Sequence, residues 1–118
     1  MKQTILLTIS VLLLVFSSCK KDNPTPSTPT GNATFWNNNS NVGVITVYVI
    51  GATYTSQITY NYTPTGCNYN GCANFTLPPG NYMWSASSTT GQSWSSNATI
   101  PNNVLTVTEG GCLLFQLQ

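Results

Sequence analysis

The sequence lacks histidine altogether and has very few charged side chains: three Lys or Arg and two Asp or Glu among 118 residues. Residues 23–118 contain no Lys, Arg, Asp or His, so Glu109 carries the single formal charge of this stretch. Soluble domains average about 25% charged residues, and this chain departs strongly from that composition. Its polar character comes instead from Asn, Thr, Ser and Tyr.

This shortage of charge excludes whole classes of function. Affinity for nucleic acid comes mainly from Lys and Arg at the phosphate backbone, so we expect no nucleic-acid partner. General acid–base catalysis uses His, Asp, Glu or Lys, glycosidases need a pair of carboxylates, and a Ser or Cys nucleophile needs a base beside it. Glu109 alone meets none of these requirements. We therefore expect a protein that is not an enzyme, without catalytic residues or cofactor.

The N-terminus has the pattern of an export signal. Lys2 precedes an apolar run over residues 5–16, and the small residues Ser17 and Ser18 follow. The run is about twelve residues long, shorter than the roughly 18 to 20 that span a bilayer as a helix. A basic start, a short apolar centre and small residues at its end are typical of a secretory signal.

The end of this signal resembles a known attachment motif. The stretch Phe16-Ser17-Ser18-Cys19 is similar to the relaxed lipobox of Bacteroidetes-type bacterial lipoproteins, although Phe16 stands where Leu is commoner. The resemblance implies cleavage before Cys19, a diacylglyceryl thioether on its sulfur and an acylated amino terminus. Several acyl chains make a stable membrane anchor. It also implies a place in the cell envelope, on the outer membrane and facing the periplasm or the surface. An ordinary secretory signal with an unrelated cysteine is the alternative.

Composition divides the chain into three parts. Residues 1–18 form the lipoprotein signal, and residues 19–32 are the lipidated cysteine followed by a Pro- and Thr-rich linker. Such a linker favours extended conformations and reaches at most about 40 Å at roughly 3.1 Å per residue. Residues 33–118 remain as the folded domain.

The folded domain has the pattern of an all-β protein. Short apolar or β-branched runs alternate with Gly, Pro and Asn turns, which predicts a small antiparallel β-sandwich of about seven to eight strands. In residues 42–50 Ile45, Val47 and Val49 share one face while Tyr48 and Ile50 share the other, which indicates a central strand. The strands are expected at 33–37, 42–50, 55–62, 73–77, 81–87, 93–100, 104–108 and 112–117.

Alternation also predicts the core. The side chains expected to face inward are Tyr82, Trp84 and Ala86; Trp94, Ala98 and Ile100; Leu105 and Val107; and Leu113, Phe115 and Leu117.

Three segments of the domain resemble a family of small sandwiches. Residues 47–51, the stretch Phe75-Thr76-Leu77-Pro78-Pro79-Gly80-Asn81-Tyr82, and residues 106–117 look like a PEGA-type module. They also resemble the wider carboxypeptidase-regulatory or transthyretin-like group. This chain departs from the pattern in a Tyr-rich insertion at residues 54–72 and in Ile50. The resemblance implies a non-catalytic accessory domain.

Three cysteines lie in the domain. Oxidation is the usual fate of cysteines in an exported protein, so we favour a structural disulfide between Cys67 and Cys72, worth about 2 kcal/mol. Cys112 would then be a buried free thiol on a strand, although Cys67–Cys112 and Cys72–Cys112 links remain open. Without His, a fourth zinc ligand is missing, and we expect no metal site. Four residues between Cys67 and Cys72 do not match a catalytic redox pair.

The aromatic residues are the remaining candidates for binding. Tyr54, Tyr60, Tyr62 and Tyr69 could stack on sugar rings, with the tryptophans beside them. The alternative is that Trp84 and Trp94 belong to the core and that the tyrosines suit β-strands.

Together these patterns predict a lipid-anchored envelope protein whose sandwich serves as a structural or protein-interaction module. Its partners would be the membrane and an envelope protein or a glycan. A carbohydrate-binding module is the alternative, and an adhesin or assembly subunit pairing through an edge strand is a further one.

Overall fold

The computed structural model describes residues 28–100 and 102–118, and the export signal, Cys19 and most of the linker lie outside the described residues. This part of the chain is all-β, as predicted, and none of its helices is long and apolar enough to cross a membrane. Its elements are β1 (Gly31–Trp36), the 3-10 turn η1 (Ser40–Val42), β2 (Ile45–Val49), β3 (Thr55–Ile58), β4 (Ala73–Leu77), β5 (Gly80–Tyr82), β6 (Trp84–Ser88), β7 (Ser93–Ser95), β8 (Leu105–Val107) and β9 (Cys112–Gln116).

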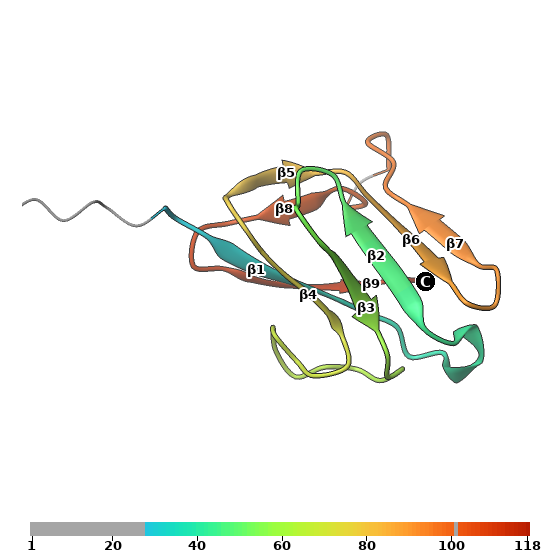
Figure 1. Cartoon of the computed structure of the whole chain (residues 1–118). Coiled ribbons are helices and arrows are strands. Elements are labelled where there is room, and N and C mark those ends of the chain that lie inside the picture. The colour runs from blue at the N-terminus through green and yellow to red at the C-terminus, as the bar shows by residue number, and fades with distance from the viewer. Residues whose placement is uncertain (1–27, 101) are drawn as a thin grey trace, which may run out of the picture.

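These strands form two larger sheets and one smaller one. The first sheet has the order β4-β1-β9, the second β3-β2-β6-β7, and β5 pairs with β8 (Figure 1). The β8 strand contacts both β1 and β9, so the small pair adjoins the three-stranded sheet. Every described pair is antiparallel except β1 with β9, which run parallel with Asn32 opposite Cys112. The expectation of a purely antiparallel sandwich is therefore wrong at this pair.

Several predicted strands have different bounds in the structure. The first begins at Gly31, inside the predicted linker, and the segment predicted at 55–62 ends as a strand at Ile58. The segment predicted at 81–87 changes partner at Met83, since β5 pairs with β8 whereas β6 pairs with β2. The segment predicted at 93–100 ends as a strand at Ser95. Beyond it, the Asn97 side chain accepts hydrogen bonds from the N–H and hydroxyl of Thr99. Such local bonding competes with a strand ladder.

As a result, the prediction that Ala98 and Ile100 face the core is wrong, because both are exposed. The other inward sets are confirmed: Trp84, Ala86, Leu105, Val107 and Leu117 are buried, and Tyr82, Trp94, Leu113 and Phe115 pack against the core.

The core is built around Phe35 on the inner face of β1. Its ring centroid lies 5.8 Å from that of Phe75, 5.6 Å from that of Trp84 and 5.2 Å from that of Phe115. Such pairs contribute about 0.5–1.5 kcal/mol each beyond the burial of their area. Since Trp84 comes from β6 and the others from β4 and β9, this cluster joins the two layers. In the facing sheet β2 is central, as predicted, and Ile45, Val47 and Val49 are fully buried.

The outer face of β1 is covered by the segment 59–72, which we call the cover loop. Thr34 points away from the core, yet its exposed fraction is 0%. Its hydroxyl donates to the Asn74 side-chain oxygen at 2.8 Å and accepts from the Asn68 N–H at 3.0 Å. Asn74 also donates to the carbonyl oxygens of Tyr69 and Cys72. The last part of the cover loop, from Asn68 to Cys72, is therefore hydrogen-bonded to the sheet.

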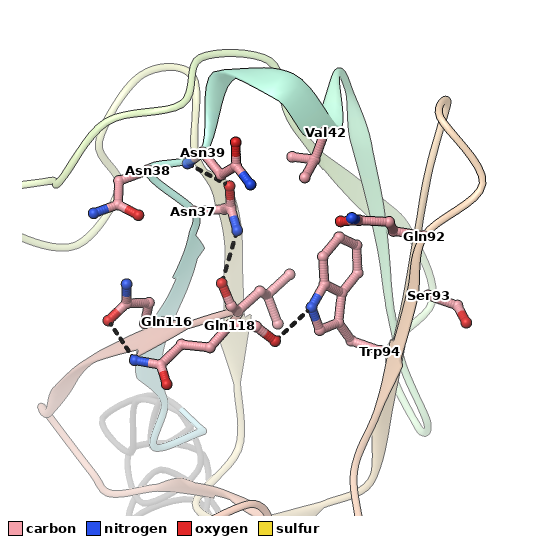
Figure 2. Close-up of a pocket in the computed structure, with 10 residues that line it drawn as sticks. Asn37, Asn38, Asn39, Val42, Gln92, Ser93, Trp94, Gln116 and Gln118 are labelled. Atoms are coloured by element: carbon pink, nitrogen blue, oxygen red, sulfur yellow. Dashed lines mark hydrogen bonds between the residues drawn. The ribbon is translucent and has the colours of Figure 1, made fainter.

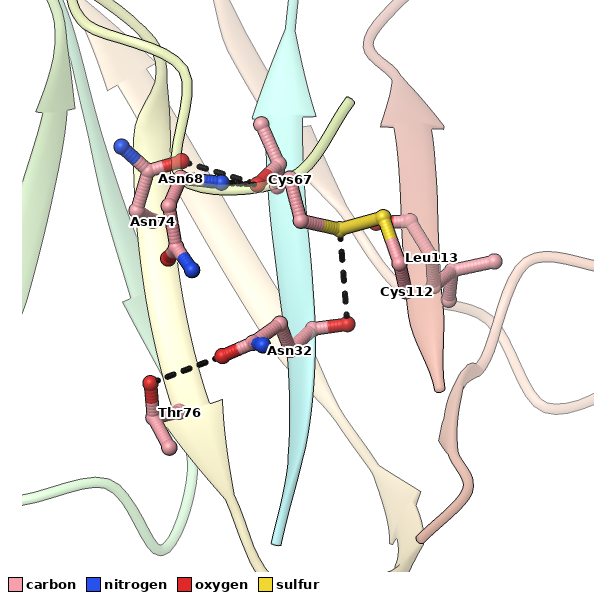
Figure 3. Close-up of a disulfide and its surroundings, with 8 residues drawn as sticks. Asn32, Cys67, Asn68, Asn74, Thr76, Cys112 and Leu113 are labelled. Atoms are coloured by element: carbon pink, nitrogen blue, oxygen red, sulfur yellow. Dashed lines mark hydrogen bonds between the residues drawn. A yellow bond between two sulfur atoms is a disulfide. The ribbon is translucent and has the colours of Figure 1, made fainter. Parts of the chain in front are cut away.

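A disulfide holds the cover loop to the far strand of this sheet. Cys67 pairs with Cys112 at the start of β9, with a Cα–Cα distance of 5.7 Å, and Cys72 is a buried free thiol (Figure 3). The favoured Cys67–Cys72 pairing is therefore wrong, and so is the buried free thiol expected at Cys112. Cys72 directly precedes β4, whereas Cys67 reaches β9, and β1 lies between those two strands. The loop spreads across the sheet instead of closing on itself.

This pairing can be tested by peptide mapping and by stability. Because residues 23–118 contain no Lys or Arg, chymotrypsin is the suitable protease, and cleavage after Tyr69 separates Cys67 from Cys72. We expect a non-reduced digest to join the Cys67 and Cys112 peptides. The link spans 45 residues, so Cys112→Ser should lower the free energy of unfolding in urea by roughly 2–4 kcal/mol.

Cys72→Ala is the matched control, because it removes a thiol that crosslinks nothing. Its cost should be about 1 kcal/mol. A Cys67–Cys72 peptide pair in the digest, or equal losses in the two variants, would contradict the assignment.

Candidate functional site

Three of the four tyrosines predicted to bind a ligand lie together on the cover loop. The ring centroids of Tyr60 and Tyr62 are 6.2 Å apart, and those of Tyr62 and Tyr69 are 5.4 Å apart. Tyr54 instead stacks on Phe75 at 5.3 Å, and its hydroxyl oxygen accepts a hydrogen bond from the Thr76 N–H at 3.0 Å. The structure thus brings together Tyr60, Tyr62 and Tyr69, whereas Tyr54 packs on β4.

The contacts of these three tyrosines hold the loop in shape. The Tyr62 hydroxyl donates to the carbonyl oxygen of Asn70, and the Tyr60 ring lies against Gly71. Partial burial raises the pKa of the Tyr62 phenol, and the nearby ionisable Cys72, Tyr69 and Tyr60 raise it further. The Tyr60 and Tyr62 rings meet at 43° and the Tyr62 and Tyr69 rings at 67°, so they form no single flat platform. Ligand binding by these tyrosines stays a prediction.

A polar cleft lies at the end of the sandwich where β1 and β9 finish. It has a volume of about 560 Å³ and is lined on one side by Asn37, Asn38 and Asn39, which follow β1. Gln92, Ser93 and Trp94 line the opposite side, and residues 116–118 line its base (Figure 2). We call this hollow the end cleft. It combines amide side chains from the three-stranded layer with an indole from β7, the outer strand of the other layer.

Two asparagines build one wall of the end cleft. The exposed fraction of Asn37 is only 4%, and its amide nitrogen donates to the Leu117 carbonyl oxygen at 2.7 Å. The Asn37 side-chain oxygen accepts from the Asn39 N–H, and the Asn39 side chain accepts from the Asn41 N–H at the start of η1. These bonds fix the turn after β1. Asn38, between the two, is exposed.

The opposite wall is fixed by Trp94. Its indole N–H donates to the main-chain oxygen of Gln118 at 2.8 Å, and its ring packs partly against the core. The side chain is half-buried, so the rest of the ring is open to the cleft. A second hollow of about 360 Å³ adjoins the first and shares Trp94 with it.

The side chains that line the end cleft carry no charge. None of these side chains is ionisable, and Glu109 lies in the turn between β8 and β9, where the Gly110 N–H donates to the Thr30 carbonyl oxygen. That turn is at the beginning of β1, whereas the cleft is at its end. Among residues 28–100 and 102–118 no three His, Cys, Asp or Glu side chains gather as metal ligands. The side chains of the cleft can therefore hydrogen-bond a neutral ligand, and none of them is an acid or a base.

The end cleft is not predicted by the sequence because each segment that lines it also has another role. The run Asn37–Asn41 has turn chemistry, and the turn is present. Trp94 was expected in the core, and part of its ring is there. Nothing in the local pattern indicates that the two segments face one another. The signal that could have drawn attention to them is the excess of uncharged amides beside a tryptophan.

Comparisons with known proteins give little guidance. No family model matches the chain, and no curated protein matches it. Among solved structures, a leucine-rich repeat protein from Bacteroides thetaiotaomicron is 21% identical, with a TM-score of 0.41 over 77% of this chain. The match spans 12% of the length of that protein. A likeness at this level carries no conclusion about fold or function.

The packing of the cover loop can be tested at two glycines. Gly71 has a φ of 87°, and a Cβ there would overlap the Tyr60 ring. A left-handed conformation costs a residue with a side chain roughly 1–2 kcal/mol, so Gly71→Ala should lower the free energy of unfolding by about 1–3 kcal/mol. Gly66→Ala is the matched control, since a Cβ at Gly66 meets no atom within 4 Å. Equal stability of the two variants in urea would show that Tyr60 does not pack on Gly71.

The free thiol gives a pH-dependent test. Burial raises the pKa of the Cys72 thiol, so the folded protein keeps this proton at a pH where the unfolded chain loses it. Stability from this group is therefore present below the unfolded thiol pKa of about 8.5 and declines as the pH rises above it. We expect iodoacetamide to label Cys72 slowly in the native protein at about pH 8.5 and rapidly in urea. Fast native labelling, or an unchanged pH slope of stability in Cys72→Ala, would contradict this.

Proposed function

We propose that the chain is a lipid-anchored protein of the cell envelope whose β-sandwich binds a partner and catalyses no reaction. The observation that carries the proposal is that β1 starts at one end of the domain whereas the end cleft lies at the other. The strand β1 begins at Gly31, and the end cleft, lined by uncharged side chains, lies beyond the other end of that strand. An anchor at Cys19 would therefore leave the cleft facing away from the membrane.

The disulfide supports the proposal that the protein is exported. Structural disulfides form and persist in oxidising compartments and are rare in the cytosol. The Cys67–Cys112 link holds the cover loop to the sheet and fits a domain that folds after export. The lipobox-like stretch that ends at Cys19 supplies the attachment signal, and residues 20–30 supply a linker before β1.

The proposal that the domain binds a partner is supported by the position of the charge on its surface. Glu109 is exposed in a turn at the anchored end of the domain, remote from the end cleft.

The resemblance to PEGA-type accessory modules is consistent with the turn Leu77-Pro78-Pro79-Gly80. Tyr82 packs against the core there, and its hydroxyl donates to the Pro78 carbonyl oxygen at 2.6 Å.

The anchor is tested by substitution at the lipidation site. In the native host, a clickable palmitate analogue should label the wild-type protein, which should sediment with the outer membrane. Cys19→Ala should lose the label and leave the membrane fraction, because no acyl chain is then attached.

Cys72→Ala is the control, since it also removes one thiol but should keep the label and the location. Membrane retention of Cys19→Ala with undiminished labelling would overturn the proposed anchor.

A further inference from the structure

We infer that the end cleft binds a neutral oligosaccharide, with Trp94 as the stacking wall and the amides of Asn38 and Gln92 as hydrogen-bonding groups. The inference rests on the proposed function, because it names the class of partner that the domain binds. It places the site at Trp94 rather than at the tyrosines of the cover loop.

The absence of charged side chains from the end cleft favours a neutral ligand. A charged ligand in a cleft needs a counter-charge or several strong donors aimed at it, because ions are costly to remove from water. The end cleft is lined by amides, one serine, two aliphatic side chains and an indole. Each amide offers both a donor and an acceptor. This matches sugar hydroxyls, which also donate and accept, whereas phosphate and carboxylate groups only accept.

Two amides are free to meet a ligand. Figure 2 draws hydrogen bonds from Asn37 and between Gln116 and Gln118, but none from the side chains of Asn38 or Gln92. These two residues are exposed on opposite walls of the end cleft. A ligand placed between them would therefore gain hydrogen bonds without breaking those that hold the turn after β1.

The indole is held ready for stacking. The bond from its N–H to Gln118 and its packing on the core fix the ring before any ligand arrives. Fixing a side chain in advance reduces the entropy lost on binding. An aromatic face next to polar groups suits a sugar ring, which has an apolar face and hydroxyls around its edge.

The size of the site favours more than one sugar ring. The end cleft, at about 560 Å³, falls within the roughly 300–1,000 Å³ usual for ligand sites. The adjoining hollow of about 360 Å³ continues past Trp94 and adds Ser95, Asn102 and Asn103 to the lining. A short linear oligosaccharide could lie across both hollows with the indole at the middle.

The experiment measures glycan binding by the full chain, purified in detergent with its anchor. The probes are the neutral hexasaccharides of cellulose, xylan, mannan and starch, titrated by calorimetry and by tryptophan fluorescence. We expect at least one to bind, Trp94→Ala to weaken it at least tenfold, and Trp94→Phe to weaken it less. Asn38→Ala and Gln92→Ala should each weaken it about threefold, and near-ultraviolet circular dichroism checks the fold of every variant.

Tyr60→Ala is the matched control, because it removes an exposed aromatic ring on the cover loop and should leave binding unchanged. The two amide variants keep the test valid should Trp94→Ala fail to fold, since neither amide bonds to the protein in Figure 2.

Several outcomes would overturn the inference: no binding of any of the four probes, loss of binding in Tyr60→Ala with retention in Trp94→Ala, or binding of uncharged peptides in place of the glycans. The assay in detergent does not depend on membrane attachment, so its outcome is independent of the outcome of the test at Cys19.

Discussion

The structure depends on the burial of β1 on both of its faces. On the inner face Phe35 contacts aromatic rings from both layers, including Trp84 of the facing sheet. On the outer face Thr34 is fully buried beneath the cover loop, to which its hydroxyl is bonded. A strand in the middle of a sheet with one solvated face would leave that polar group to water. Here the loop takes the place of a third layer over β1, and the disulfide holds it down.

This arrangement suits a domain that has almost no charge. Residues 23–118 contain one ionised side chain, so ion pairs cannot fix the loops. Uncharged hydrogen bonds do so instead: Asn37 bonds to Leu117 just after β9, and Asn74 ties the cover loop to β4. The Trp84 indole donates to the main-chain oxygen of Asn103. Such bonds are not screened by salt as exposed ion pairs are. The shortage of charged side chains therefore also determines how the loops are held.

The features that could be predicted from the sequence are those with a local period. Alternation along β2 gives its inner face, and it places Trp84 and Leu105 inside. The features that could not be predicted depend on residues far apart in the chain. The partner of Cys67 and the burial of Thr34 follow from the path of the cover loop over the sheet, and the parallel pairing of β9 joins the first and last strands of the domain. Ala98 and Ile100 continue the alternation of apolar residues but lie in a turn, because the Asn97 side chain accepts a hydrogen bond from the Thr99 N–H.

The direction of β1 places the candidate site. The strand starts at Gly31 and ends at Trp36, and the end cleft lies beyond its end. The parallel pairing of β9 brings the segment 116–118 to the same remote end, where it meets the turn after β1. Trp94 reaches this end from the other layer and bonds to Gln118. An antiparallel β9 would have carried that segment back toward the start of β1. The one pairing that departs from the predicted sandwich is thus the one that assembles the end cleft beyond the end of β1.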